Sequence, residues 1–231
     1  MSMLEKLTAW VTGIDYGVLA ALLWQGTLET LYMVTASSLL TFIMALPLGV
    51  FLLITSPGGL FALVRLNAVL GALVNAVRSL PFVILMVALM PFTALIAGTR
   101  IGTTAAIVPL TLGTVPFTAR LFETSLRTVS PGLIEAAQAM GASPRQIIMR
   151  VLVPEALPEL IRNATLTVIV LISNSAMAGI IGGGGLGDLA LRFGYMRFRV
   201  DVMVATVLVL IVMVQLVQMG GDYLARRSDH R

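Results

Sequence analysis

The sequence predicts an all-α membrane protein with five membrane-spanning helices, and two observations lead to this fold class. Hydrophobic residues make up 58% of the 231 residues, only 11% are charged, and the mean hydropathy is +0.99, which lies well outside the range of soluble globular domains. Five stretches also lack Asp, Glu, Lys and Arg, and each is near or above the ~20 residues that cross a bilayer. They are Thr30–Val64, Ser79–Thr99, Ile101–Ala119, Asn163–Gly187 and Val202–Gly221.

The first span is expected to begin near Trp24 and to end at Ile54, before the turn sequence TSPGG. Residues 1–23 are expected to form a periplasmic or interfacial lead-in. They do not resemble a cleavable signal peptide, because Glu5, Lys6 and Asp15 interrupt any basic region followed by an apolar run.

The second span is expected to start as early as Asn67 and to include Arg78, with kinks at Pro81 and Pro91. The third span contains the run TTAAIVPLTLGTVPFTARLFETSL, which has two prolines, six threonines and one glycine. Such a composition is typical of a helix that packs closely or lines a pathway rather than facing lipid. Simple packing and a lined pathway both remain open.

The fourth span is expected over Leu157–Ile181 and ends in the run GGGGLGD. These glycines follow a membrane helix rather than a strand, so they indicate a flexible or tight corner outside the membrane and not a nucleotide loop. The fifth span covers Val202–Gly221, and residues 223–231 are expected to form a cytoplasmic tail. We expect the whole chain, 1–231, to be one transmembrane domain.

The basic residues predict the orientation. With the N-terminus outside, ten of the fifteen Lys and Arg residues fall on the cytoplasmic side and five fall outside. Because cytoplasmic loops carry the excess of positive charge, the N-terminus is expected outside and the C-terminus inside.

Composition also limits the chemistry. Cysteine is absent and His230 is the only histidine, so no metal site is expected. Lys6, the only lysine, lacks the glycine context of a phosphate-binding loop, so any ATP must be hydrolysed by another subunit. The ionisable residues near the spans are expected at span ends, which argues against proton or ion coupling, and no nucleophile–base pair predicts an enzyme. They are Glu29, Arg120, Glu123, Arg162, Asp188 and Asp201.

The segment 130–156 is too polar and interrupted to cross lipid. Ser130 and Pro131 predict the start of a short helix that reaches Met140 and stops at Gly141. Ser143, Pro144 and Gln146 then predict a second helix with a capping box, while Pro154 and Pro158 predict a break or kink before the fourth span. Two capped helices around a glycine indicate a docking element, and an interfacial helix that only tucks the loop against the membrane is the alternative.

This segment resembles the EAA loop of permeases of binding-protein-dependent ABC importers of type I. Glu135-Ala136-Ala137, Gly141, Val151 and Val153-Pro154 have the spacing of that loop, with Val151 and Val153 in place of Ile and Leu. The resemblance implies a cytoplasmic coupling helix that sits in a groove of a separate ATPase subunit, and that ATPase would bind ATP and Mg. The coupling residues implied are Glu135, Ala136, Ala137, Met140, Gly141, Ala142, Ser143 and Pro144.

The runs IVPLTLGTVPFTARLFETSLRTVSPGLIEAAQAMGAS and NSAMAGIIGGGGLGDLALRFGY are similar to the permease family of methionine importers, over about residues 20–225. The resemblance implies a non-enzymatic homodimer in the bacterial inner membrane, with two ATPase subunits, an external binding protein and no nucleic acid, importing D- or L-methionine. It implies a gate at Met177, with Ser175 and Asn174 beside it, although ordinary packing remains open for all three. The alternatives are an importer of another amino acid or small solute, and a channel or secondary transporter.

Overall fold

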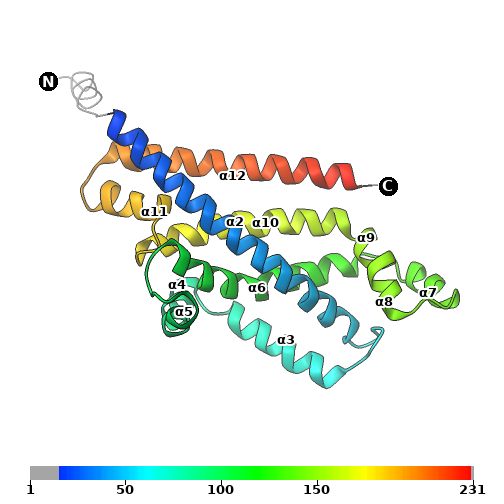
Figure 1. Cartoon of the computed structure of the whole chain (residues 1–231). Coiled ribbons are helices and arrows are strands. Elements are labelled where there is room, and N and C mark those ends of the chain that lie inside the picture. Colours follow the sequence, from blue (N-terminus) through cyan, green and yellow to red (C-terminus); the bar gives the residue numbers. More distant parts are fainter. Residues whose placement is uncertain (1–15, 230–231) are drawn as a thin grey trace.

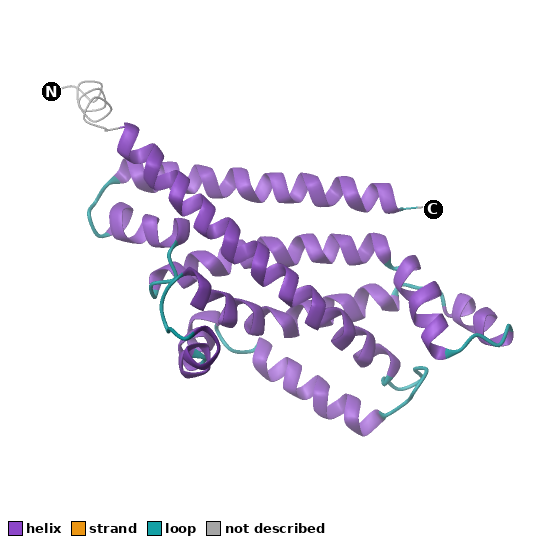
Figure 2. Ribbon diagram, in the orientation of Figure 1, coloured by secondary structure: helices purple, strands orange, loops and turns teal. Residues whose placement is uncertain are grey.

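The computed structural model describes residues 16–229, and within this range every regular element is a helix (Figures 1 and 2). The lead-in predicted for residues 1–23 lies mostly outside the described residues, as do His230 and Arg231. The helix α2 already begins at Tyr16, so the first span starts earlier than the predicted Trp24. Pro47 lies inside α2 without ending it.

Twelve further elements follow α2 (Tyr16–Ile54). They are α3 (Val64–Arg78), α4 (Phe82–Ala88), α5 (Met90–Ala97), α6 (Thr103–Arg127), α7 (Pro131–Ala139), α8 (Pro144–Ile147), the π-helical turn η1 (Ile148–Leu152), α9 (Val153–Glu155), α10 (Leu157–Ile180), α11 (Gly185–Leu189), the π-helical turn η2 (Ala190–Tyr195) and α12 (Val200–Ser228).

Four helices in the described range, α2, α6, α10 and α12, are long and apolar enough to cross a membrane. A fifth crossing exists only if α3 and α4 count together as one span, and these two helices meet at an angle of 102°. The kink predicted at Pro81 is therefore a sharp bend. Pro81 disfavours the helical conformation at Leu80 and cannot donate a backbone hydrogen bond, so α3 ends at Arg78 and Pro81 precedes α4.

The helix α6 lies at the centre of the bundle and packs against α2, α3, α4, α5 and α10 (Figure 1). In its most apolar window 67% of residues are buried, against 33% or less in the other three long helices. Small residues and threonines permit this close approach: a Cβ at Gly49 of α2 would lie 2.8 Å from the backbone oxygen of Ala119. The prediction that this span packs closely is confirmed.

The glycine run after α10 forms a tight corner, in agreement with one of the two forms predicted for it. Gly184 has a φ of +77°, which side chains other than glycine rarely tolerate. The backbone N–H of Gly185 donates to Glu29 Oε2 over 2.7 Å, and the N–H of Leu186 donates to Thr30 Oγ1 over 2.9 Å. Two side chains of α2 therefore hold this corner and the start of α11.

The last helix continues past the predicted end of the fifth span. α12 extends to Ser228, so most of the predicted tail 223–231 is helical, and its end lies beside α10, where Arg162 and Asp229 approach to 3.9 Å. Gly221 packs directly against Thr165 of α10, whereas a Cβ on the adjacent Gly220 would meet nothing within 4 Å.

This pair of neighbouring glycines tests the α10–α12 packing. Replacing Gly221 by Ala places a methyl group on Thr165, and we expect the free energy of unfolding to fall by about 1–3 kcal/mol. Replacing Gly220 by Ala fills open space and restores helix propensity, so we expect no loss of stability. Thermal unfolding of the two variants in the same detergent measures the difference, and equal melting temperatures would contradict the packing.

Candidate functional site

The segment after α6 forms a short helix whose ends match the predicted signals closely. Pro131 occupies the first turn of α7, although Ser130, its N-cap, makes no side-chain capping hydrogen bond. The helix ends at Ala139 with Met140 as C-cap, and Gly141 has a φ of +78°. The left-handed glycine reverses the chain at the predicted position.

A second helix starts directly after this turn. The backbone N–H of Ser143 donates to Gln146 Oε1 over 2.8 Å, and the N–H of Gln146 reaches Ser143 Oγ at 3.4 Å, which forms the predicted capping box. The helical chain then continues through η1 and α9, and the interruption before α10 falls at Ala156. Pro154 and Pro158 occupy the first turns of α9 and α10, where the missing N–H is tolerated.

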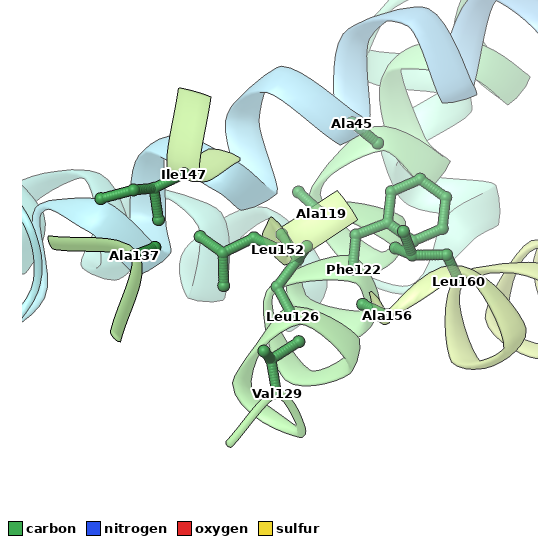
Figure 3. Packing of buried hydrophobic residues seen from close by; sticks show 10 residues of the cluster. All are labelled: Ala45, Ala119, Phe122, Leu126, Val129, Ala137, Ile147, Leu152, Ala156 and Leu160. Atoms are coloured by element: carbon green, nitrogen blue, oxygen red, sulfur yellow. The ribbon is translucent and has the colours of Figure 1, made fainter. Parts of the chain in front are cut away.

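One face of α7 packs into the protein, as Figure 3 shows. Ala137 is only 4% exposed and belongs to a hydrophobic cluster with the end of α6 and the segment 147–160, while Ile134 packs against the same cluster. The cluster consists of Ala45, Ala119, Phe122, Leu126, Val129, Ala137, Ile147, Leu152, Ala156 and Leu160. Ala137 therefore points inward, and α7 packs against α8 and η1.

A neighbouring face of α7 is exposed and partly apolar. Leu133, Ala136 and Met140 are spaced so that they share one face of the helix, and Met140 is 81% exposed. Glu135 is also exposed, and it lines a pocket of about 610 Å³ between α7 and the 56–60 turn. Large exposed apolar side chains on a short, well-capped helix are typical of a docking surface.

The eight residues of the predicted coupling site therefore divide into two groups. Glu135, Ala136, Met140, Gly141 and Ser143 are exposed, whereas Ala142 and Pro144 are partly buried and Ala137 is buried. The sequence motif alone does not separate these groups. Within α7, the helical period separates buried Ala137 from exposed Glu135, because Ala137 lies on the side of Ile134 and not on that of Glu135.

Three charged side chains of α6 lie immediately before α7. Glu123 is 6% exposed, and its two carboxylate oxygens bind Arg120 and Arg127, each over 2.7 Å. Arg120 also donates to the backbone oxygen of Gly71 in α3 over 3.2 Å. The i,i+3 and i,i+4 spacing of these residues was a sequence signal for this network, which holds α3 and the end of α6 together.

The three predicted gate residues lie on different sides of α10. Ser175 is buried, and its hydroxyl donates to the backbone oxygen of Ile172 over 2.7 Å. Asn174 and Met177 are three residues apart and share an open face, on which Met177 is 42% exposed. Asn174 also lines a pocket with Arg78, Thr114 and Phe117.

The chain is similar to permeases of known transport systems. It is 55% identical over 210 residues to the probable D-methionine transport system permease protein MetI of Vibrio cholerae, which covers 91% of this chain and 93% of that protein. It is 46% identical over 210 residues to the methionine import system permease protein MetP of Bacillus subtilis, covering 90% and 94%.

Solved structures agree. A chain of the MetNI methionine ABC transporter, in an inward-facing conformation, matches with a TM-score of 0.92 and 44% identity, covering 94% of this chain and all of that one. An amino acid ABC transporter matches at 17% identity with a TM-score of 0.73, which supports the fold alone. The model of the family described as "Binding-protein-dependent transport system inner membrane component" matches residues 45–231, and the chain therefore belongs to this family.

Proposed function

We propose that this chain is the permease subunit of an ATP-driven importer that carries methionine across the bacterial inner membrane. The observation that carries the proposal is the extended likeness to methionine permeases, which covers both the bundle and the α7 segment. The chain is a transport component and not an enzyme. ATP and Mg would be bound by a separate ATPase, and this chain needs no cofactor of its own.

The exposed face of α7 is the proposed ATPase contact. Leu133, Ala136 and Met140 offer an apolar surface next to the Glu135 carboxylate, and the capping box and Gly141 fix its shape before a partner arrives. A helix with one apolar exposed face fits a groove on a folded partner. Ala137, Ala142 and Pro144 would act by holding α7 in place.

The packing of α7 supports a mechanical role. Three residues, 128–130, connect α6 to α7, and the buried cluster joins both helices to the segment 147–160. A force on α7 would therefore reach α6 through the 147–160 segment and the 128–130 connection, because close-packed side chains transmit displacement rather than absorb it. ATP-driven closure of two ATPase subunits would in this way reorient the bundle between inward- and outward-facing states.

A homodimer with two ATPase subunits is the proposed assembly. The described part of one chain has only four or five spans, and a two-fold pair would enclose a path between equivalent faces. A solute-binding protein would deliver substrate at the end opposite α7, and lipid would surround the outer faces of α2 and α12. Met177 and Asn174 share an open face of α10 and suit a gate, while buried Ser175 would support it.

The arrangement of the termini supports the proposed orientation. The start of α2 lies at one end of the bundle, and the end of α12 lies at the other end, the one from which α7, α8 and α9 project (Figure 1). If α7 contacts a cytoplasmic ATPase, the C-terminus is inside and the N-terminus outside. This is the orientation that the distribution of basic residues favours.

Charge on the apolar face of α7 tests the ATPase contact. We expect Met140→Glu to reduce recovery of the ATPase with the tagged permease by about tenfold or more, because a buried interface anchor is replaced by a desolvated charge. Gln138→Glu adds the same charge on another side of α7 and should leave recovery unchanged. The measurement is a pull-down in mild detergent with quantitative mass spectrometry, and equal recovery from both variants would argue against this contact surface.

Transport itself tests the substrate and the energy source. In proteoliposomes containing the complete complex, with the binding protein on one side and ATP on the other, we expect accumulation of labelled methionine that a non-hydrolysable ATP analogue does not support. Ionophores that collapse ion gradients should leave this accumulation unchanged. Uptake driven by an ion gradient without ATP would favour a secondary transporter, and ATP-driven uptake of another solute would favour an importer of different specificity.

A further inference from the structure

We propose that Arg78 binds the carboxylate of an amino-acid substrate halfway across the membrane, in a pocket between α3, α4, α6 and α10. This inference rests on the proposed function and adds a recognition site to it. The pocket has a volume of about 180 Å³ and is lined by Val77, Arg78, Leu80, Phe82, Leu85, Gly113, Thr114, Phe117, Val170 and Asn174.

The depth of the pocket follows from the two long helices that line it. Gly113–Phe117 lie at the middle of α6, which extends from Thr103 to Arg127, and Val170 and Asn174 lie in the central and later part of α10. Arg78 is the last residue of α3 and lines the same pocket, so it lies beside the middle of α6. An ionisable residue at this depth is costly in lipid, and such residues mark substrate or ion pathways.

Within the described part of the chain, Arg78 lacks the acidic partner that several arginines near the spanning helices have. Arg120, Arg127, Arg162, Arg192 and Arg199 each pair with an Asp or Glu side chain. Among residues 16–229, no acidic side chain forms an ion pair with Arg78, whose guanidinium carbon lies 5.9 Å from the ring centre of Phe117. A positive charge at mid-membrane without an acidic partner is a site for an anionic group that enters from outside the chain.

Two further polar side chains in the pocket lack partners. Thr114 is only 2% exposed, and its hydroxyl has no hydrogen-bond partner among the described residues. The side-chain amide of Asn174 likewise has none within residues 16–229. A buried hydroxyl such as that of Thr114 is normally paired, and it lies in one pocket with the exposed Arg78 and the half-buried Asn174, so the three groups together can bind a polar ligand.

The rest of the lining suits an amino acid with an apolar side chain. Phe82, Leu85 and Phe117 supply an apolar wall next to Arg78, so a carboxylate and an apolar side chain can be accommodated together. Arginine forms a planar fork that binds both oxygens of a carboxylate. The hydroxyl of Thr114 and the side-chain amide of Asn174 can form hydrogen bonds with the substrate's ammonium group or with its carboxylate oxygens.

The experiment compares Arg78→Gln and Arg78→Lys with the wild-type complex in lipid nanodiscs, and Arg65→Gln is the matched control. Arg65 lies in the first turn of the same helix, is exposed and does not line the pocket. Binding of labelled L-methionine is measured without binding protein, in competition with unlabelled L-methionine or L-methioninamide, which has the same side chain but no carboxylate. Methionine uptake and ATPase activity are measured on the same variants.

In the wild type and in Arg65→Gln, we expect methionine to compete at least about tenfold better than methioninamide. Only methionine has a carboxylate that can form charge-assisted hydrogen bonds with Arg78. Arg78→Gln should lose this preference and at least about tenfold of its uptake while still assembling with an active ATPase. Arg78→Lys keeps the positive charge but loses the planar fork, so it should retain part of the preference, which a purely structural role for Arg78 does not predict.

Three results would overturn the proposal. They are an unchanged preference or uptake in Arg78→Gln, an equal affinity of the wild type for both compounds, and an assembled Arg78→Lys complex without preference. Failure of the wild-type complex to transport methionine would instead remove the proposed function, and this inference with it.

Discussion

The burial of α6 is the constraint on which the rest of the structure depends. A chain in lipid must satisfy its backbone within helices, and it gains little from burying one apolar surface against another. Close approach of small residues must supply the contact instead, as where Gly49 meets Ala119. Because α2, α3, α4, α5 and α10 all pack on α6, the position of this helix sets the positions of the others.

The pairing of charged side chains differs between two positions along α6. Toward its end nearest α7, α6 carries Glu123 between two arginines, so that a buried carboxylate is fully paired. At its middle the same helix faces Arg78, which has no acidic partner in the described range. Arg120 and Glu123 connect α3 to α6, because Arg120 also donates to Gly71 of α3. Arg78 instead remains available to bind an anionic group on the proposed transport pathway. The paired Glu123 belongs to α6, whereas Arg78 lies at the end of α3, beside the middle of α6.

Much of this fold could be predicted from the sequence because lipid imposes simple rules on length and polarity. The long spans, the central role of the threonine-rich helix and the capping box of Ser143 and Gln146 all follow from local patterns. The 102° bend could not be predicted, since Pro81 indicates only that a helix is disturbed and the angle depends on the packing of α4 and α5 against α6. The pocket that Arg78 shares with α6 and α10 depends on this bend too, although the sequence does place Arg78 within the second span.

The candidate site shows the same limit at the level of single residues. Spacing predicts that Glu135, Ala136 and Ala137 belong to one functional segment, but it does not say which of them meets a partner. The burial of each side chain decides this, because Ala137 is buried within the hydrophobic cluster and Ala136 is exposed. The proposed coupling needs both the exposed and the buried residues of α7. Without buried Ala137 the helix would not be held on the bundle, and without the exposed residues it would not contact the ATPase. In the proposed mechanism the exposed face of α7 receives the force and the buried face passes it to the cluster, through which the displacement would reach α6 and Arg78.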